Sequence, residues 1–300
     1  MPTPLLTDSG LETWLAFIRG VDLPDFAAFP LLDTTAGQAL LTEYFRDHLR
    51  VAAEAGSGVV LETPTWRASS DWGARLGYDD DELNRVNRDA VRFVRALGDE
   101  VEVEVVVSGN IGPRGDGYDP AELLAPEEAA SYHRPQIDSF VAAGADRVTL
   151  LTATHAGEAT GVVQAAASAG IEVVVAFTVE TDGRLPTGQP LHDAIAEVDA
   201  ATGRAALHFG INCAHPDHFS QALDADPTAI ERLGLLRANA SRASHAQLNE
   251  AEELDGGDPL ELADQYAQLL RSHPHFQVLG GCCGTDVRHV EAIARACVPR

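Results

Sequence analysis

Residues 147 to 177 read RVTLLTATHAGEATGVVQAAASAGIEVVVAF, in which two short apolar runs flank a longer segment. The runs Arg147 to Leu151 and Val173 to Phe177 are rich in β-branched and aliphatic residues, as expected of strands buried on both faces. Residues 156–169 between them have the length and composition of a helix. A strand, a helix and a second strand in this order predict a parallel βαβ unit.

The same alternation of apolar run and helical segment continues in both directions along the chain. Eight runs are expected to form buried parallel strands: Leu5 to Thr7, Val59 to Leu61, Val103 to Val107, Arg147 to Leu151, Val173 to Phe177, Ala206 to Ile211, Leu233 to Leu236 and Gln277 to Leu279. Helices are expected near residues 36–55, 81–97, 126–143, 156–169, 190–201, 216–225, 258–272 and 286–297. Eight is the number of βα units that closes a barrel.

The predicted fold class is therefore α/β, a (β/α)8 TIM barrel that forms a single domain over residues 1–300. An open doubly wound sheet is the alternative, but it normally carries a glycine-rich phosphate turn after its first strand. That position reads Asp8-Ser9-Gly10-Leu11-Glu12-Thr13 here, which favours the barrel. Two insertions, residues 14–35 and 240–258, interrupt the pattern, and neither has the composition of an interdomain linker.

Composition and charge exclude several classes of partner. The formal net charge of -25 and the isoelectric point near 4.6 would repel nucleic acid and anionic lipid surfaces. The chain is 45% hydrophobic with a mean hydropathy of -0.08, which is typical of a globular protein with a sizeable core. No apolar stretch is long enough to span a membrane, and the first residues do not form a signal peptide. We therefore expect a cytoplasmic protein with small-molecule partners.

Three of the four cysteines follow predicted strands. Cys213 comes after the sixth strand, and Cys282 and Cys283 come after the eighth. Because active sites of this fold lie at the carboxyl ends of the strands, the three thiols are expected to meet at one rim of the barrel. Three thiolates leave one corner of a tetrahedral zinc ion open, which is typical of a catalytic site. Gly280, Gly281 and Gly284 would let the chain turn where the adjacent cysteines must face one ion.

Other interpretations of these residues stay open from the sequence alone. The three cysteines could be buried free thiols, and Cys297 in the last helix is expected to be a small apolar contact. A mixed site with histidine is a further alternative, for which the candidates are His155, His208, His215 and His218. We expect His215 and His218 to be solvated or to cap the helix that follows the sixth strand.

Nearly the whole chain resembles the homocysteine S-methyltransferase family. The resemblance lies in Asp8-Ser9-Gly10-Leu11-Glu12-Thr13, Glu62 to Ser69, Ser108 to Pro113, Tyr132 to Ile137, Gly210-Ile211-Asn212-Cys213 and Gly280-Gly281-Cys282-Cys283-Gly284-Thr285. The last two segments match the metal motifs of the family most closely. Members of the family are zinc barrels that move a methyl group from an onium, sulfonium or folate donor to the sulfur of homocysteine.

The resemblance implies a set of site residues and a chemistry. Cys213, Cys282 and Cys283 would be the zinc ligands, and Asp8 would contact the amino group of the acceptor. The implied substrate-binding residues are Asp8, Gly10, Thr63, Trp66, Arg67 and Asn212. A free thiol has a pKa of about 8.5, whereas a thiol coordinated to zinc is deprotonated. The expected activity is zinc-dependent S-methyl transfer to homocysteine or a related small thiol, as in methionine biosynthesis.

Several positions depart from the family pattern. The family has a glutamate after strand four that also holds the homocysteine ammonium group, and this chain has Leu151-Thr152 there. Glu62 and Glu180 are candidates to replace that charge, and Arg67 suggests an anionic group on the donor or acceptor. Two alternatives follow: the same chemistry on a thiol or selenol that lacks the amino-acid head group, or a zinc-binding barrel without catalysis.

Overall fold

The computed structural model describes residues 3–118 and 123–299, and in these residues eight parallel strands close into a barrel. The strands are β1 (Leu5–Thr7), β2 (Val59–Glu62), β3 (Val105–Ile111), β4 (Arg147–Ala153), β5 (Glu172–Phe177), β6 (His208–Asn212), β7 (Leu233–Ala238) and β8 (Val278–Gly281). The first and last strands pair with each other, with Leu5 opposite Val278 and Leu6 opposite Leu279. This closure confirms the (β/α)8 class and excludes the open sheet.

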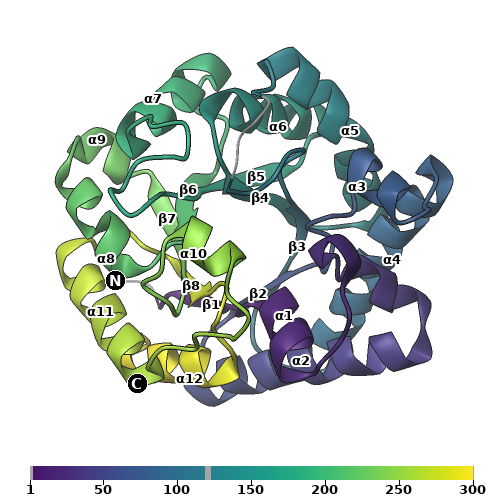
Figure 1. Ribbon diagram of the computed structural model, residues 1–300, viewed down its shortest axis with the longest axis horizontal. Coiled ribbons are helices and arrows are strands. Elements are labelled where there is room, and N and C mark those ends of the chain that lie inside the picture. The colour runs from purple at the N-terminus through teal and green to yellow at the C-terminus, as the bar shows by residue number, and fades with distance from the viewer. Residues whose placement is uncertain (1–2, 119–122, 300) are drawn as a thin grey trace.

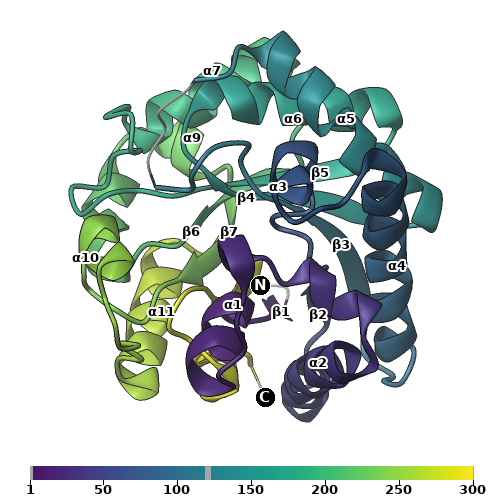
Figure 2. The same cartoon turned by 45° about the vertical axis from the view of Figure 1, so that its right-hand side comes forward.

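A ring of helices surrounds the strands, as the view down the barrel shows (Figure 1). The long ones are α2 (Thr35–Ala55), α4 (Asp80–Gly98), α5 (Pro126–Ala143), α6 (Ala156–Ala169), α7 (Leu191–Thr202), α11 (Pro259–Ser272) and α12 (Val287–Cys297). The same ring is seen from the side in the turned view (Figure 2). Among the described helices, none combines the length and the apolar character that a membrane span requires.

The helix predicted over residues 216–225 is wrong as a continuous element. The chain instead forms α8 (Pro216–Phe219), a 3-10 segment (Ser220–Asp224) and α9 (Pro227–Ile230). The Ser220 hydroxyl donates to the Pro216 carbonyl at 2.6 Å, a side-chain bond that bends helices. Asp226 precedes a proline, so it is extended rather than helical, and its side chain caps α9.

The two insertions contain short helices near one end of the barrel. The first includes a π-helical turn (Trp14–Ile18) that continues α1 (Leu11–Thr13), and 3-10 turns at Pro24–Phe26 and Phe29–Asp33. The second insertion contains α10 (His245–Asn249), and α3 (Ser70–Arg75) follows β2. In Figure 1, α1 and α10 lie in front of the strands. The insertions thus add walls at the end of the barrel where the strands stop.

Apolar side chains fill two layers because successive residues of a strand face opposite sides of the sheet. The larger layer packs between the strands and the helix ring, with Leu61, Val107 and Phe209 among its fully buried members. A smaller cluster of Val60, Leu151, Val174, Ala176, Leu235 and Val278 fills the inside of the barrel. The inside of the barrel is therefore a packed core, so the room for a ligand is at the carboxyl end of the strands.

Candidate metal centre and substrate cavity

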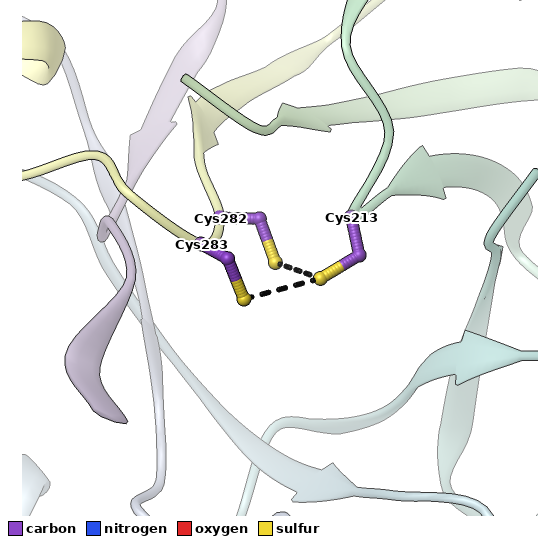
Figure 3. Close-up of side chains that lie close together, drawn as sticks. All are labelled: Cys213, Cys282 and Cys283. Atoms are coloured by element: carbon purple, nitrogen blue, oxygen red, sulfur yellow. Dashed lines mark hydrogen bonds between the residues drawn. The ribbon is translucent and has the colours of Figure 1, made fainter. Parts of the chain in front are cut away.

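The three predicted cysteines converge at the carboxyl ends of β6 and β8. The Sγ atom of Cys213 lies 2.9 Å from that of Cys282 and 3.4 Å from that of Cys283. Their side chains point toward one another from two separate loops (Figure 3). The three ligand atoms lie within 4.8 Å of one another, so together they can hold a metal ion.

The local backbone conformation orients the sulfur atoms of Cys213, Cys282 and Cys283. Gly284 has φ +80°, and Cys213 itself adopts a left-handed φ of +56°, which is uncommon for a residue with a side chain. Gly280 lets β8 approach β1 closely, because a Cβ there would lie 2.6 Å from the Asp8 carbonyl oxygen. Gly280 and Gly284 were expected to let the chain turn at the cysteines. The close approach of β8 to β1 shows why position 280 requires a glycine.

The donor set fits a zinc ion. Zinc–sulfur bonds of about 2.3 Å place two sulfurs of a tetrahedral site about 3.8 Å apart. The Cys213 sulfur is less than 1 Å closer than that to each of its partners, so a modest opening of the cluster would admit the ion. The Asn212 amide nitrogen lies 3.7 Å from the Cys282 sulfur. The same amide bonds to Thr152 through both its oxygen, at 2.8 Å, and its nitrogen, at 3.0 Å, which fixes its orientation.

The thiols of Cys282 and Cys283 differ in the direction in which their pKa values are shifted. Hydrogen bonds from Cys213 and Cys283 hold the pKa of the Cys282 thiol well below its usual range, and the Arg237 charge adds to this effect. The pKa of Cys283 is raised, mainly because its thiol donates to Cys213 and Cys282. The cluster therefore favours one thiolate, at Cys282, which is the form that binds a metal.

A tyrosine that the sequence did not single out contacts the cluster. The Tyr118 hydroxyl lies 3.2 Å from the Cys213 sulfur and 3.7 Å from the Cys283 sulfur. Its ring stacks on His245, with centroids 4.0 Å apart. His245 in turn lies 2.8 Å from the Cys213 carbonyl oxygen and 2.9 Å from Glu180. These residues come from three different loops with no characteristic spacing, so only the fold could reveal them.

The cysteines line a cavity of about 390 Å³ at this end of the barrel. The six residues expected to bind substrate all line it: Asp8, Gly10, Thr63, Trp66, Arg67 and Asn212. Gly10 approaches the metal loop closely, since a Cβ there would lie 2.5 Å from the Cys282 carbonyl oxygen. Phe17, Phe26 and Leu248 from the two insertions complete the apolar part of the wall. The cavity thus brings the predicted residues together, while their contacts with substrate stay predictions.

Asp8 is paired with a buried arginine that the sequence analysis missed. The Arg237 Nη1 atom lies 2.8 Å from Asp8 Oδ1, and both side chains are 4% exposed. Tyr44 and Thr7 also donate to the Asp8 carboxylate, at 3.3 and 3.1 Å. Burial opposes the charge of Arg237, but Asp8 and Cys282 outweigh it and raise the pKa of the guanidinium. Arg237 stands in the otherwise apolar strand β7, and this feature of the sequence could have indicated a buried charge.

The two candidate replacements for the missing acid differ in position. Glu62 is 2% exposed, ends β2 and lines the cavity. Glu180 is paired with His245 beside the cluster, and its side chain is 35% exposed. Leu151 belongs to the apolar cluster inside the barrel, as its side chain requires. Of the two acids, Glu62 alone is among the residues found on the cavity wall.

Arg67 is held flat between two tryptophans. Its guanidinium carbon lies 3.9 Å from the centre of the Trp66 ring and 3.6 Å from that of Trp72. Nη1 donates to the Gly115 carbonyl at 3.0 Å. Burial lowers the pKa of Arg67 to about 10, which leaves it charged at neutral pH. A role toward an anionic group stays a prediction.

No histidine joins the cluster of metal-capable groups found in the described part of the chain. His215 caps α8 by accepting a hydrogen bond from the Asp217 amide at 3.2 Å, as expected. Cys297 lies in α12 and packs against the apolar core, also as expected. In the described residues, the candidate metal site therefore consists of cysteines alone and not of cysteine and histidine together.

The fold and site define a (β/α)8 barrel with three convergent cysteines that can hold a metal ion beside a small-molecule cavity. The family model described as homocysteine S-methyltransferase matches residues 5–297. The chain belongs to the homocysteine S-methyltransferase family, and it is an S-methyltransferase by class. The resemblance found in the sequence is confirmed.

The relatives are distant in sequence but match along their whole length. Homocysteine S-methyltransferase 4 of Zea mays is 23% identical and covers 97% of this chain and 88% of its own. Homocysteine S-methyltransferase of Escherichia coli (strain K12) is 24% identical, over 96% of this chain and 94% of its own. The crystal structure of the homocysteine methyltransferase MmuM from Escherichia coli in its metallated form has 21% identity, a TM-score of 0.78 and coverage of 98% and 96%. The structural likeness supports the barrel fold.

Proposed function

We propose that this protein transfers a methyl group from a sulfonium or other onium donor to the sulfur of homocysteine or a related small thiol. The observation that carries the proposal is the meeting of Cys213, Cys282 and Cys283 on the wall of one cavity. The names of the relatives support homocysteine as the acceptor. The product of that reaction would be methionine, so a place in methionine biosynthesis belongs to the proposal.

Zinc is the proposed metal, because three soft sulfur ligands favour it over magnesium or calcium. When bound, it would supply a fourth position for the acceptor sulfur and lower the pKa of the acceptor thiol, whose proton would be released to solvent as the acceptor binds. Asn212 would hold its amide against Cys282, and the thiolate character of Cys282 would favour metal uptake. The fit of zinc to this site rests on the donor set and on the spacing of the sulfurs.

The side chains of the cavity have the task of positioning. The new carbon–sulfur bond forms as the donor's own bond to the methyl carbon breaks, and the electron pair of that bond stays with the donor. No side chain needs to act as a base, so the cavity contributes alignment and the exclusion of water. We propose Asp8, Gly10, Thr63, Trp66, Arg67 and Asn212 as its substrate-facing residues.

A cytoplasmic location is part of the proposal. The described cysteines are all free, and thiols that must bind a metal persist in a reducing compartment. Disulfide formation within the cluster would remove the ligands, so a reducing environment suits the proposed chemistry.

The proposal is tested by purifying the protein without added metal, measuring zinc, and assaying methyl transfer by mass spectrometry. Sulfonium, quaternary ammonium and folate donors should each be combined with several thiols. We expect about one zinc per chain and methyl transfer to homocysteine from at least one onium donor. Zinc content without transfer to any thiol would instead identify a zinc-binding barrel that does not catalyse.

A second candidate acceptor is a thiol or selenol without an amino-acid head group. Two observations favour it: Leu151 stands where the family has an acid, and Asp8 is already paired with Arg237. In the same assay, this candidate predicts faster transfer to a simple alkyl thiol than to homocysteine.

A further inference from the structure

Most of the hydrogen-bonding capacity of the Asp8 carboxylate is used within the protein. Its Oδ1 atom is 2.8 Å from the Arg237 guanidinium and 3.1 Å from the Thr7 hydroxyl, and its Oδ2 atom accepts from Tyr44 at 3.3 Å. Arg237 is held in place by two further bonds, to the carbonyls of Gly281 and Ser9, each at 3.0 Å. The charge of Asp8 is therefore compensated from within the protein.

Glu62 is in the opposite situation. Its side chain lines the cavity that contains the three thiols, and only 2% of the residue is exposed. Neither carboxylate oxygen has a hydrogen-bond partner among the described residues. Ser108, its register neighbour on β3, is hydrogen-bonded to Thr149 at 2.7 Å, and its nearby hydroxyl lowers the pKa of Glu62 without forming a full hydrogen bond to it. A buried carboxylate without a partner is unfavourable unless a ligand or a proton completes it.

The charged groups around Glu62 do not satisfy it. Arg147 on β4 and Arg237 on β7 attract it through the barrel, but among the described residues neither forms an ion pair with it within 4.0 Å. Arg237 forms its ion pair with Asp8, and Arg147 is not among the residues found on the cavity wall. The arginines reduce the cost of burying the charge without pairing with it, and burial still raises the pKa of Glu62, so a cationic group beside the carboxylate would stabilise its charged form.

We propose that Glu62 binds the ammonium group of the thiol acceptor, in place of Asp8 and of the acid that Leu151 replaces. This inference rests on the proposed function for the acceptor's thiol, which would bind at the cysteines of the same cavity. An acceptor held by its sulfur at one wall and by its ammonium group at Glu62 would be an amino thiol. The amine-binding charge of this barrel would then lie at the end of β2, while Arg237 neutralises Asp8.

Binding of two thiols that differ only in the amino group tests this assignment. The zinc-loaded protein is titrated calorimetrically with homocysteine and with 4-mercaptobutanoate, which lacks the amino group. We expect the wild type to bind homocysteine more tightly by about 30-fold or more, the usual effect of a buried charge pair. Glu62→Gln should remove most of this preference while leaving the affinity for 4-mercaptobutanoate within a few fold.

Two further variants separate recognition from structure. Glu104→Gln, an exposed acid just before β3 at the other end of the barrel, should keep the wild-type preference. Glu62→Asp keeps the charge and should restore part of the preference. A wild type that binds the two thiols equally, or an Asp8→Asn variant that loses the preference while Glu62→Gln keeps it, would overturn the assignment. A preference for homocysteine without methyl transfer would contradict the proposed activity and leave the assignment standing.

Discussion

Arg237 and Asp8 form a buried ion pair of 2.8 Å that links the ends of β7 and β1. The same guanidinium also holds the carbonyl of Gly281, directly before the metal loop. One side chain therefore joins the strand end that carries Asp8 to the strand end that carries two of the cysteines. The pair fixes the floor of the cavity and neutralises the charge of Asp8 there.

Removing the arginine should destabilise the protein strongly. Arg237→Met leaves the Asp8 carboxylate buried without its partner, which costs about 3 to 5 kcal/mol in comparable cases. The free energy of unfolding from urea titration measures the effect. Combining Arg237→Met with Asp8→Asn should recover part of the loss. Arg242→Met is the matched control, because the Arg242 pairs with Asp217 and Glu261 are exposed, so it should change stability by less than about 1 kcal/mol.

Replacing one cluster cysteine should remove the metal and the activity together. Cys283→Ala takes away one of the three sulfur ligands, so zinc measured by inductively coupled plasma mass spectrometry should fall from about one per chain to near zero. Cys297→Ala serves as the control, since Cys297 lies in α12 outside the cluster. Equal zinc content in the two variants would show that Cys283 is not a ligand.

Stability should fall as the solution becomes acidic, in part through His208. Burial and, to a smaller extent, the Arg147 charge together lower the pKa of His208 from an ordinary value of 6.5 to about 4. Between these values the unfolded chain binds a proton that the folded chain does not, so the free energy of unfolding decreases as the pH falls from about 6.5 toward 4. One proton accounts for at most about 1.4 kcal/mol per pH unit.

A variant without that histidine isolates its share. Urea titrations at pH 7.5 and 5.0 should show a smaller pH dependence for His208→Gln than for the wild type. Some dependence should remain, because burial also lowers the pKa of His215 to about 4. An unchanged difference between the two pH values would show that His208 is protonated equally in both states.

Donor binding should depend on pH through Glu12. Burial, with smaller contributions from the nearby Cys282 and Asp8, raises the pKa of Glu12 to about 7. Glu12 lines the cavity, so its negative charge above pH 7 should favour a cationic sulfonium donor. We expect the KM for such a donor to decrease severalfold between pH 6 and 8, and Glu12→Gln to flatten this dependence. A profile that keeps its shape in Glu12→Gln would assign the titration to another group.

The sequence by itself determined the barrel and the cluster of three cysteines that can hold a metal ion. The strand candidates are short apolar runs, and their alternation with helical segments defines eight units. The pattern is visible in the sequence because buried positions require apolar residues. The convergence of Cys213 with Cys282 and Cys283 followed from one topological rule, that all strand ends of such a barrel face one rim. The segment 216–225 does not form one α-helix because the Ser220 hydroxyl bonds to the Pro216 carbonyl and a 3-10 turn follows from Ser220 on.

Only the tertiary structure decided which charges meet inside the barrel. Arg237, Asp8 and Glu62 lie at the ends of three different strands, and no spacing rule in the sequence relates them. Their pairing depends on the tilt and stagger of the closed sheet and on where each side chain finds room, which are properties of the packed molecule. Tyr118 and His245 became part of the site for the same reason, since their rings stack only after two distant loops fold over the thiols.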